Sequence, residues 1–132
     1  MVNTLISTDT RYPVNRKIIR RAVNDVFDKH KIQNIEAEVS VSVVGARKMK
    51  DLTERYLGDK EDHEVLTFAL EEISSDQAGF VNPPDELLRL GDIVLCWPKI
   101  LDLASSDDVL VDDEVYFLTS HGVEHLLGEH HT

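Results

Sequence analysis

The spacing of apolar residues changes along the first half of the chain from a helical to an extended pattern. Over residues 14–29 apolar side chains recur every three or four positions, which predicts an amphipathic helix that begins just after Pro13. Over residues 35–43 apolar and mostly polar residues alternate, which predicts a strand with one buried face. Gly45 ends this strand, and residues 46–57 again have the spacing of a helix.

Strand and helix patterns also alternate in the second half. Residues 65–70 and 92–97 predict strands, the second ended by Pro98, and residues 99–104 predict a short helix. Residues 71–84 are rich in Ser, Gly and Pro and predict a loop, in which residues 79–81 pair briefly as a strand.

The last predicted helix begins near Asp107 or Asp108, because both are good N-cap residues, and continues to Leu126. Gly128 is expected to end it in a left-handed conformation. Interleaved helices and strands of this kind indicate an α+β fold, in which helices cover a small mixed sheet. With 132 residues the chain is expected to form a single domain over residues 1–132.

Composition limits the function further. The chain has no apolar run of bilayer length and no signal peptide, and its single Cys96 cannot form an internal disulfide. We therefore expect a cytoplasmic protein without a membrane partner.

Charge is distributed unevenly along the chain. The net charge of −11 excludes a generally basic coat for nucleic acids, yet residues 1–58 carry 11 basic against 7 acidic residues. A solvated acidic surface is the simpler interpretation of this asymmetry. The alternative is a basic face that meets a polyanion, formed by Arg16, Lys17, Arg20, Arg21, Arg47, Lys48, Lys50 and Arg55.

The residues with the most distinctive chemistry are histidines near the C-terminus. His121 and His125 are four positions apart on the predicted helix, so their imidazoles leave the same face. If Gly128 ends the helix, the chain can turn back and bring His131 to a third coordination position. His130 is an alternative ligand, but the spacing favours His131.

Three histidines that leave a fourth position open are typical of a catalytic zinc site. Bound zinc lowers the pKa of its water to about 7 and so provides a hydroxide nucleophile. The sequence therefore predicts one Zn²⁺ per chain, held by His121, His125 and His131 at the end of the C-terminal helix. Nickel, cobalt and copper ions also bind such ligands.

The spacing of the three histidines is also that of a large class of zinc peptidases. Those enzymes need a glutamate directly after the first histidine as general base, and this chain has Gly122 there. Glu124 is a candidate base or a residue that supports the metal ligands, although a solvated glutamate is the simpler interpretation. A small metallopeptidase thus remains the weakest of the functional hypotheses.

The histidine segment resembles the signature of the YbeY family of zinc-dependent endoribonucleases, H-G-x-L-H-L-x-G-Y-D-H, and reads here H-G-V-E-H-L-L-G-E-H-H. Two further segments are similar to that family, L-T-E-R-Y followed by E-V-L-T-F, and L-G-D-I-V-L. The resemblance covers roughly residues 36–131. It implies hydrolysis of single-stranded RNA in ribosomal RNA processing and ribosome maturation, with ribosomal subunits or proteins as further partners and no role for DNA.

Two positions depart from the family pattern. Leu57 stands where the family has an arginine that is thought to contact the scissile phosphate, and Arg55 or Lys60 are candidate substitutes. His63 and Glu64 replace a Thr-Asp pair; His63 is a candidate proton donor or RNA contact, or else an ordinary loop histidine. The catalytic residues are therefore undetermined, with Glu124, His63 and Arg55 as candidates. The loss of the arginine also favours a second hypothesis, a catalytically weak or inactive, metal-stabilised module for ribosome assembly.

Overall fold

The computed structural model of the chain describes residues 1–32, 34–70 and 87–131, with side chains described as far as residue 128. Its sheet contains β1 (Val2–Thr8), β2 (Ala37–Val44), β3 (Val65–Ala69) and β4 (Leu88–Cys96) in the order β1-β2-β4-β3. Strand β2 is parallel to β1 and to β4, whereas β3 is antiparallel to β4. The predicted mixed sheet is therefore confirmed.

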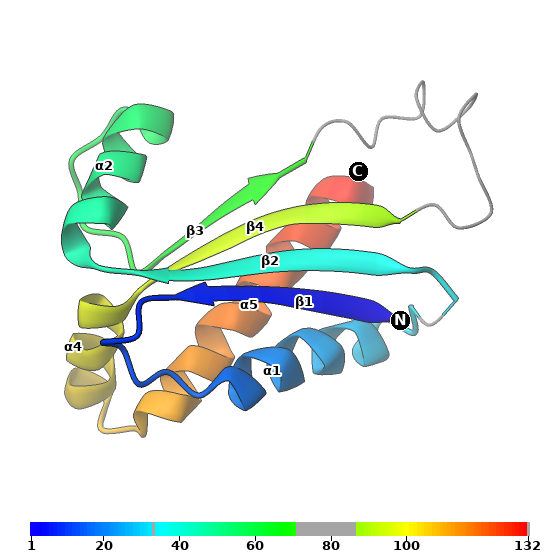
Figure 1. The fold of residues 1–132 in the computed structure, drawn as a ribbon, viewed down its shortest axis with the longest axis horizontal. Helices are drawn as coiled ribbons and strands as arrows, with labels where there is room; N and C mark the ends of the chain where they lie inside the picture. The colour runs from blue at the N-terminus through cyan, green and yellow to red at the C-terminus, as the bar shows by residue number, and fades with distance from the viewer. Residues whose placement is uncertain (33, 71–86, 132) are drawn as a thin grey trace.

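The helices of the described residues lie on both faces of this sheet (Figure 1). Helices α1 (Arg16–Lys29) and α5 (Val111–His131) cover one face, and α2 (Ala46–Leu57) stands on the other. Helix α4 (Trp97–Asp107) lies at one end of the sheet, directly after β4. Helices around a small mixed sheet confirm the predicted α+β fold.

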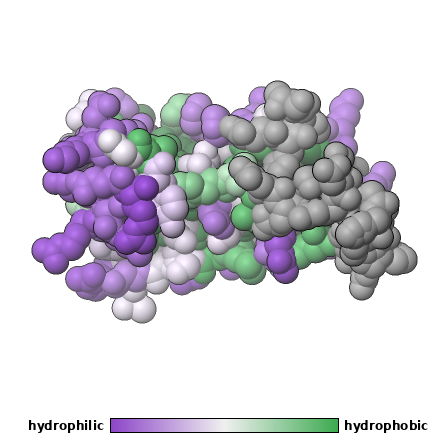
Figure 2. All heavy atoms as spheres, turned by 90° about the horizontal axis from the view of Figure 1, so that it is seen from above, coloured by the Kyte–Doolittle hydropathy of each residue, from purple (hydrophilic) through white to green (hydrophobic). Residues whose placement is uncertain are grey.

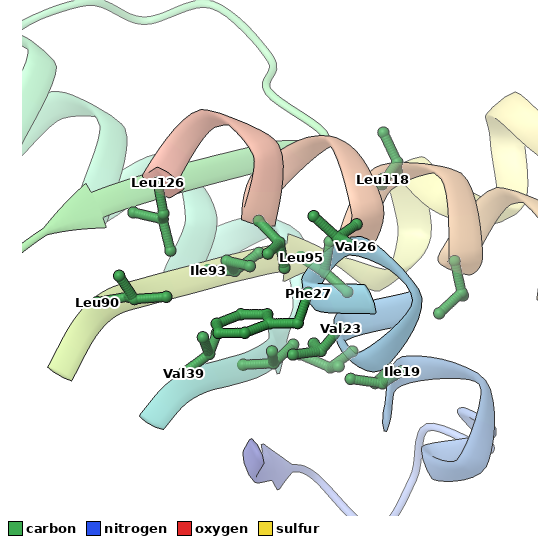
Figure 3. Close-up of a cluster of buried hydrophobic side chains, with 14 of the residues drawn as sticks. Ile19, Val23, Val26, Phe27, Val39, Leu90, Ile93, Leu95, Leu118 and Leu126 are labelled. Carbon is green, nitrogen blue, oxygen red and sulfur yellow. The ribbon is translucent and has the colours of Figure 1, made fainter. Parts of the chain in front are cut away.

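The main core fills the space between the sheet and the pair α1 and α5 (Figure 3). Its side chains come from α1, from the inward-facing positions of β2 and β4, and from α5. They include Ile19, Val23, Phe27, Val39, Val41, Ile93, Leu95, Leu118, Val123 and Leu126. These residues occupy alternate positions in the strands and positions three or four apart in the helices. The periodicity of the sequence therefore places them on the face of each element that points into the core.

A smaller apolar cluster under α2 covers part of the opposite face of the sheet. Met49 of α2 is buried there with Leu66 of β3 and with Val94 and Cys96 of β4. Cys96 thus behaves as a small buried apolar residue at the end of β4.

Several predicted boundaries were wrong. Strand β1 was not predicted, because its mixture of polar and apolar residues leaves every second side chain exposed and gives a weak pattern. Asp108 does not begin the last helix; it ends α4 in a left-handed conformation, with φ of 56°, and α5 begins at Val111. The predicted strand at residues 79–81 lies outside the described residues.

The last helix also differs at its other end. Gly128 was expected to end it, but α5 continues to His131, and Gly128 does not adopt a positive φ. A glycine inside a helix costs only about 1 kcal/mol relative to alanine, so it permits termination without enforcing it. Within the described part of the chain, no helix is long and apolar enough to span a membrane.

Candidate metal and RNA site

His121 and His125 lie on an exposed row along α5. Both side chains are exposed, and the preceding member of the row, Phe117, has 61% of its surface accessible. The rings of Phe117 and His121 stack with their centroids 6.2 Å apart and their planes at 17°. This confirms that positions four apart share one flank of the helix, as the spacing of the two histidines predicted.

Packing of α5 against the sheet orients this row. Gly122 is buried, and a Cβ atom on it would lie 3.1 Å from Ile93 of β4. A glutamate at position 122 would therefore point into the core, so the base that zinc peptidases carry at this position has no room in this fold.

Glu124 borders this row on the side of α5 that faces α1. Its carboxylate accepts a hydrogen bond from Lys29 Nζ at 2.9 Å and lies 2.6 Å from His30 Nε2. Tyr116, two turns earlier on the same flank, donates a hydrogen bond to Asp25 of α1. The hydrogen bonds from Lys29 and His30 lower the pKa of Glu124. Glu124 thus holds the two helices together and remains an ionised carboxylate at neutral pH.

The uninterrupted helix separates His131 from the other two histidines along the chain. His131 is six residues beyond His125, which corresponds to about 9 Å along a helix axis. The His131 side chain lies outside the described part of the structure. For His131 to share one ion with His121 and His125, the helix would have to end before it, as the sequence prediction assumed.

The fit of a metal ion rests on these two described imidazoles. Among the described residues no group of three His, Cys, Asp or Glu side chains is placed to hold an ion. Two exposed histidines at positions i and i+4 nevertheless fit as two ligands of zinc, which prefers nitrogen and sulfur donors. The third ligand must come from beyond the described side chains, and His131 remains the predicted one.

His63 lies before the first residue of β3, away from the histidine row. It precedes the strand by two residues. The row lies at the level of Thr67, because Gly122, next to His121, packs on Ile93 and Ile93 is paired with Thr67. At about 3.3 Å per strand residue, the level of Thr67 is roughly 13 Å further along the sheet from His63. The His63 ring lies 3.1 Å from Asp59 Oδ1, so its nearest described partner is a carboxylate of its own loop.

The C-terminal turn of α2 contains the other predicted positions. Arg55 forms a salt bridge with Asp51 one turn earlier, at 3.1 Å. Leu57 is the last residue of the helix and is 52% exposed. Tyr56 packs edge-on against Phe68 of β3, with ring centroids 5.3 Å apart. The structure therefore brings neither Arg55 nor His63 into contact with the histidine row.

A mixed sheet with a histidine-bearing helix on one face defines the structural class of this chain. The solution structure of the protein TM1509 from Thermotoga maritima has a similar fold, with a TM-score of 0.58 and 20% sequence identity over 96% of this chain and 71% of that one. At this level of identity the similarity concerns the fold alone.

The chain belongs to the family described as endoribonuclease YbeY, whose model matches residues 5–132. Three relatives named endoribonuclease YbeY illustrate the similarity. The one from Dehalococcoides mccartyi is 27% identical over 98% of this chain and 78% of its own length. The one from Moorella thermoacetica is 38% identical over 73% of this chain and 61% of its own length. The one from Lachnospira eligens is 33% identical over 87% of this chain and 75% of its own length.

Proposed function

We propose that this chain is a metal-dependent endoribonuclease that hydrolyses single-stranded RNA during ribosomal RNA processing. The observation that carries the proposal is the exposed pair of His121 and His125 on one flank of α5, in a chain of the endoribonuclease YbeY family. Ribosomal RNA is the predicted substrate, and ribosomal subunits or proteins are the predicted partners in the cytoplasm.

His121, His125 and His131 would hold one Zn²⁺ ion. When bound, the ion would supply an activated water and polarise a phosphoryl oxygen. The described residues around it bind and orient the substrate. Phe117 offers an exposed aromatic face directly beside His121, on which an unpaired base can stack. A stacking face favours single-stranded over double-stranded RNA, since paired bases are not accessible for stacking.

Glu124 is better suited to positioning α5 than to accepting a proton in the reaction. Its two oxygens already lie against Lys29 and His30, on the flank that faces α1. Arg55 and His63 remain candidates for contacts with the RNA strand. To make such a contact, Arg55 would have to leave Asp51, and His63 would have to leave Asp59.

The proposal is tested by cleavage of an end-labelled, single-stranded ribosomal RNA fragment. We expect the zinc-loaded protein to cleave this fragment, to spare the same fragment annealed to its complement, and to lose at least about 100-fold in rate in the variant His125→Ala. His30→Ala, purified identically, is the matched control, because it removes a histidine that is not on the exposed row. Equal cleavage by the parent and His125→Ala would show that cleavage does not depend on the histidine pair and would contradict the proposal.

Leu57 favours a second candidate, an inactive metal-stabilised module for ribosome assembly. The family resemblance implies an arginine at this position, and Leu57 is exposed enough to accept one. If the missing guanidinium limits catalysis, Leu57→Arg should raise kcat/KM by about 10-fold or more, since a charge-assisted hydrogen bond contributes about 1.5–3 kcal/mol. A metal-loaded parent and a Leu57→Arg variant that both fail to cleave RNA would favour the assembly module.

A further inference from the structure

A hollow of about 680 Å³ opens at the end of the sheet where the parallel strands β1 and β2 reach their carboxyl ends. It is lined by the segment that follows β1, including Arg11 and Tyr12, and by the end of β2 and the first turn of α2. It lies apart from the histidine row. Val44 in its wall pairs with Cys96, whereas Ile93, the β4 residue against which Gly122 beside His121 packs, is paired with Val41. Three strand residues correspond to about 10 Å.

The chain topology explains why a hollow forms there. After β1 the chain passes to α1 on one face of the sheet, and after β2 it passes to α2 on the other (Figure 1). Two adjacent parallel strands whose connections leave on opposite faces cannot close the space between those connections. In open α/β sheets this point is the usual place for a ligand.

Two cations without a carboxylate partner among the described residues line the hollow. Arg47 and Lys48 are exposed there, and neither forms an ion pair with any described residue. The two carboxylates in the wall are already neutralised, since Asp9 pairs with Arg11 and Asp51 pairs with Arg55. Seen from the α2 side, this end of the molecule is strongly hydrophilic (Figure 2). The eight basic residues considered in the sequence do not form one face, because α1 and α2 lie on opposite sides of the sheet.

Arg47 and Lys48 also occupy positions that are unfavourable for cations. Both lie in the first turn of α2, which contains no acidic residue and begins at Gly45 without a side-chain cap. A positive charge in this turn opposes the helix dipole and is destabilising. Phosphate oxygens beside these side chains would offset that cost, because an anion is attracted both by the two cations and by the N-terminus of the helix.

An aromatic ring forms part of the wall as well. Tyr12 stacks on Trp97 with centroids 6.2 Å apart, and the Arg11 guanidinium lies 5.8 Å from its ring centre. Its hydroxyl lies over Gly45, where a Cβ atom would be only 2.5 Å away. Tyr12 is therefore fixed in place, and an aromatic residue next to unpaired cations is the usual composition of a surface that follows a single strand.

From these observations we infer that the hollow is a second RNA-binding site, which holds backbone phosphates of the single strand through Arg47 and Lys48. This inference rests on the proposed function for the identity of the polynucleotide. The RNA strand would reach from the histidine row to the carboxyl ends of β1 and β2. The hollow would then increase the affinity for RNA, while hydrolysis takes place at the histidine site.

The test is binding of a fluorescent single-stranded RNA oligonucleotide by the full chain in a chelating buffer, followed by anisotropy at several salt concentrations. The double variant Arg47→Ala/Lys48→Ala is compared with Lys17→Ala/Arg20→Ala, which removes the same charge from exposed positions of α1 on the other side of the sheet. Loss of two phosphate contacts should make the slope of log K against log salt less steep by about 1.4 and weaken binding by about 25-fold at 0.1 M salt. The control should change the affinity by less than about threefold.

Equal weakening in both double variants, or none in Arg47→Ala/Lys48→Ala, would overturn the inference. A second arm distinguishes RNA from a free anion by the amide NMR shifts of Arg47 and Lys48. The oligonucleotide should shift both signals; shifts caused by inorganic phosphate but not by the oligonucleotide would also overturn the inference.

The two proposals fail separately. If the parent cleaves no RNA but binding depends on Arg47 and Lys48, the nuclease proposal falls and the second site stands. If the parent cleaves RNA and the two double variants bind alike, the second site falls and the nuclease proposal stands.

Discussion

Glu124 joins the two helices that cover one face of the sheet. It contacts Lys29 and His30 of α1, and these hydrogen bonds lower its pKa below the ordinary value of 4.5. A carboxyl group whose pKa is lowered on folding stabilises the folded chain above the pKa it has when unfolded. That contribution disappears as the pH falls through the lowered value.

We therefore expect Glu124→Gln to destabilise the chain at pH 7 by about 0.2–1 kcal/mol, the range for a solvent-exposed ion pair. At pH 3, below the ordinary pKa of a glutamate, part of this stabilisation of the folded chain is lost, so the parent and the variant should differ less. Urea unfolding at the two pH values measures this. A difference in stability that is the same at pH 3 and pH 7 would show that the charge of Glu124 does not contribute.

Gly91 leaves no room for a side chain. Its φ is +147°, and a Cβ atom on it would lie 2.2 Å from the Phe68 carbonyl oxygen and 3.1 Å from Leu126. Gly91→Ala should therefore cost about 3 kcal/mol or more, because backbone strain and overpacking add. Urea unfolding measures the stability of this variant. Gly128→Ala is the control, because its new methyl group meets no atom within 4 Å. Similar stability of the two variants would be inconsistent with this backbone conformation.

At the scale of the element, α5 carries two different functions on two adjoining sides. The side that faces α1 packs on it through Tyr116 and Glu124, and the adjoining row exposes His121 and His125. The helix continues through Gly128 to His131. A metal that recruits His131 must therefore compete with the last turn of the helix.

This competition makes a prediction for Gly128→Ala. Alanine favours the helix over glycine by about 1 kcal/mol, so the variant should bind zinc about fivefold more weakly if His131 joins the site only after the helix ends. Competition with a chromophoric chelator measures the affinity. Gly58→Ala, at the left-handed end of α2, changes a glycine elsewhere and should leave zinc affinity unchanged. Unchanged affinity in Gly128→Ala would argue against His131 as a ligand that requires helix termination.

At the scale of the whole molecule, metal binding should be coupled to stability. A ligand that binds only the folded chain stabilises it by about 2.7 kcal/mol at 100 times its Kd. For a chain of this size that corresponds to roughly 10 °C in Tm. We expect zinc to raise the Tm of the parent and to have little effect on His125→Ala, as followed by circular dichroism. An equal rise in both would place the ion elsewhere.

The sequence by itself determined the helices and strands with strong periodicity and the shared flank of His121 and His125. These features depend on local backbone geometry, since 3.6 residues per turn and two per strand repeat fix which side chains share a face. Most of α1, α2, β2 and β3 could be predicted for this reason. The family could also be recognised, because the histidine spacing is a local pattern.

Only the tertiary structure decided which groups meet across elements. It paired Glu124 with α1, turned Gly122 into the sheet, and put α1 and α2 on opposite faces, so that a basic hollow lies between their connections. It also let α5 continue beyond Gly128. Local spacing does not encode these outcomes, because each depends on packing between residues far apart in the chain. The local preferences involved differ by only about 1 kcal/mol, and the free energy of packing against neighbouring elements easily exceeds that.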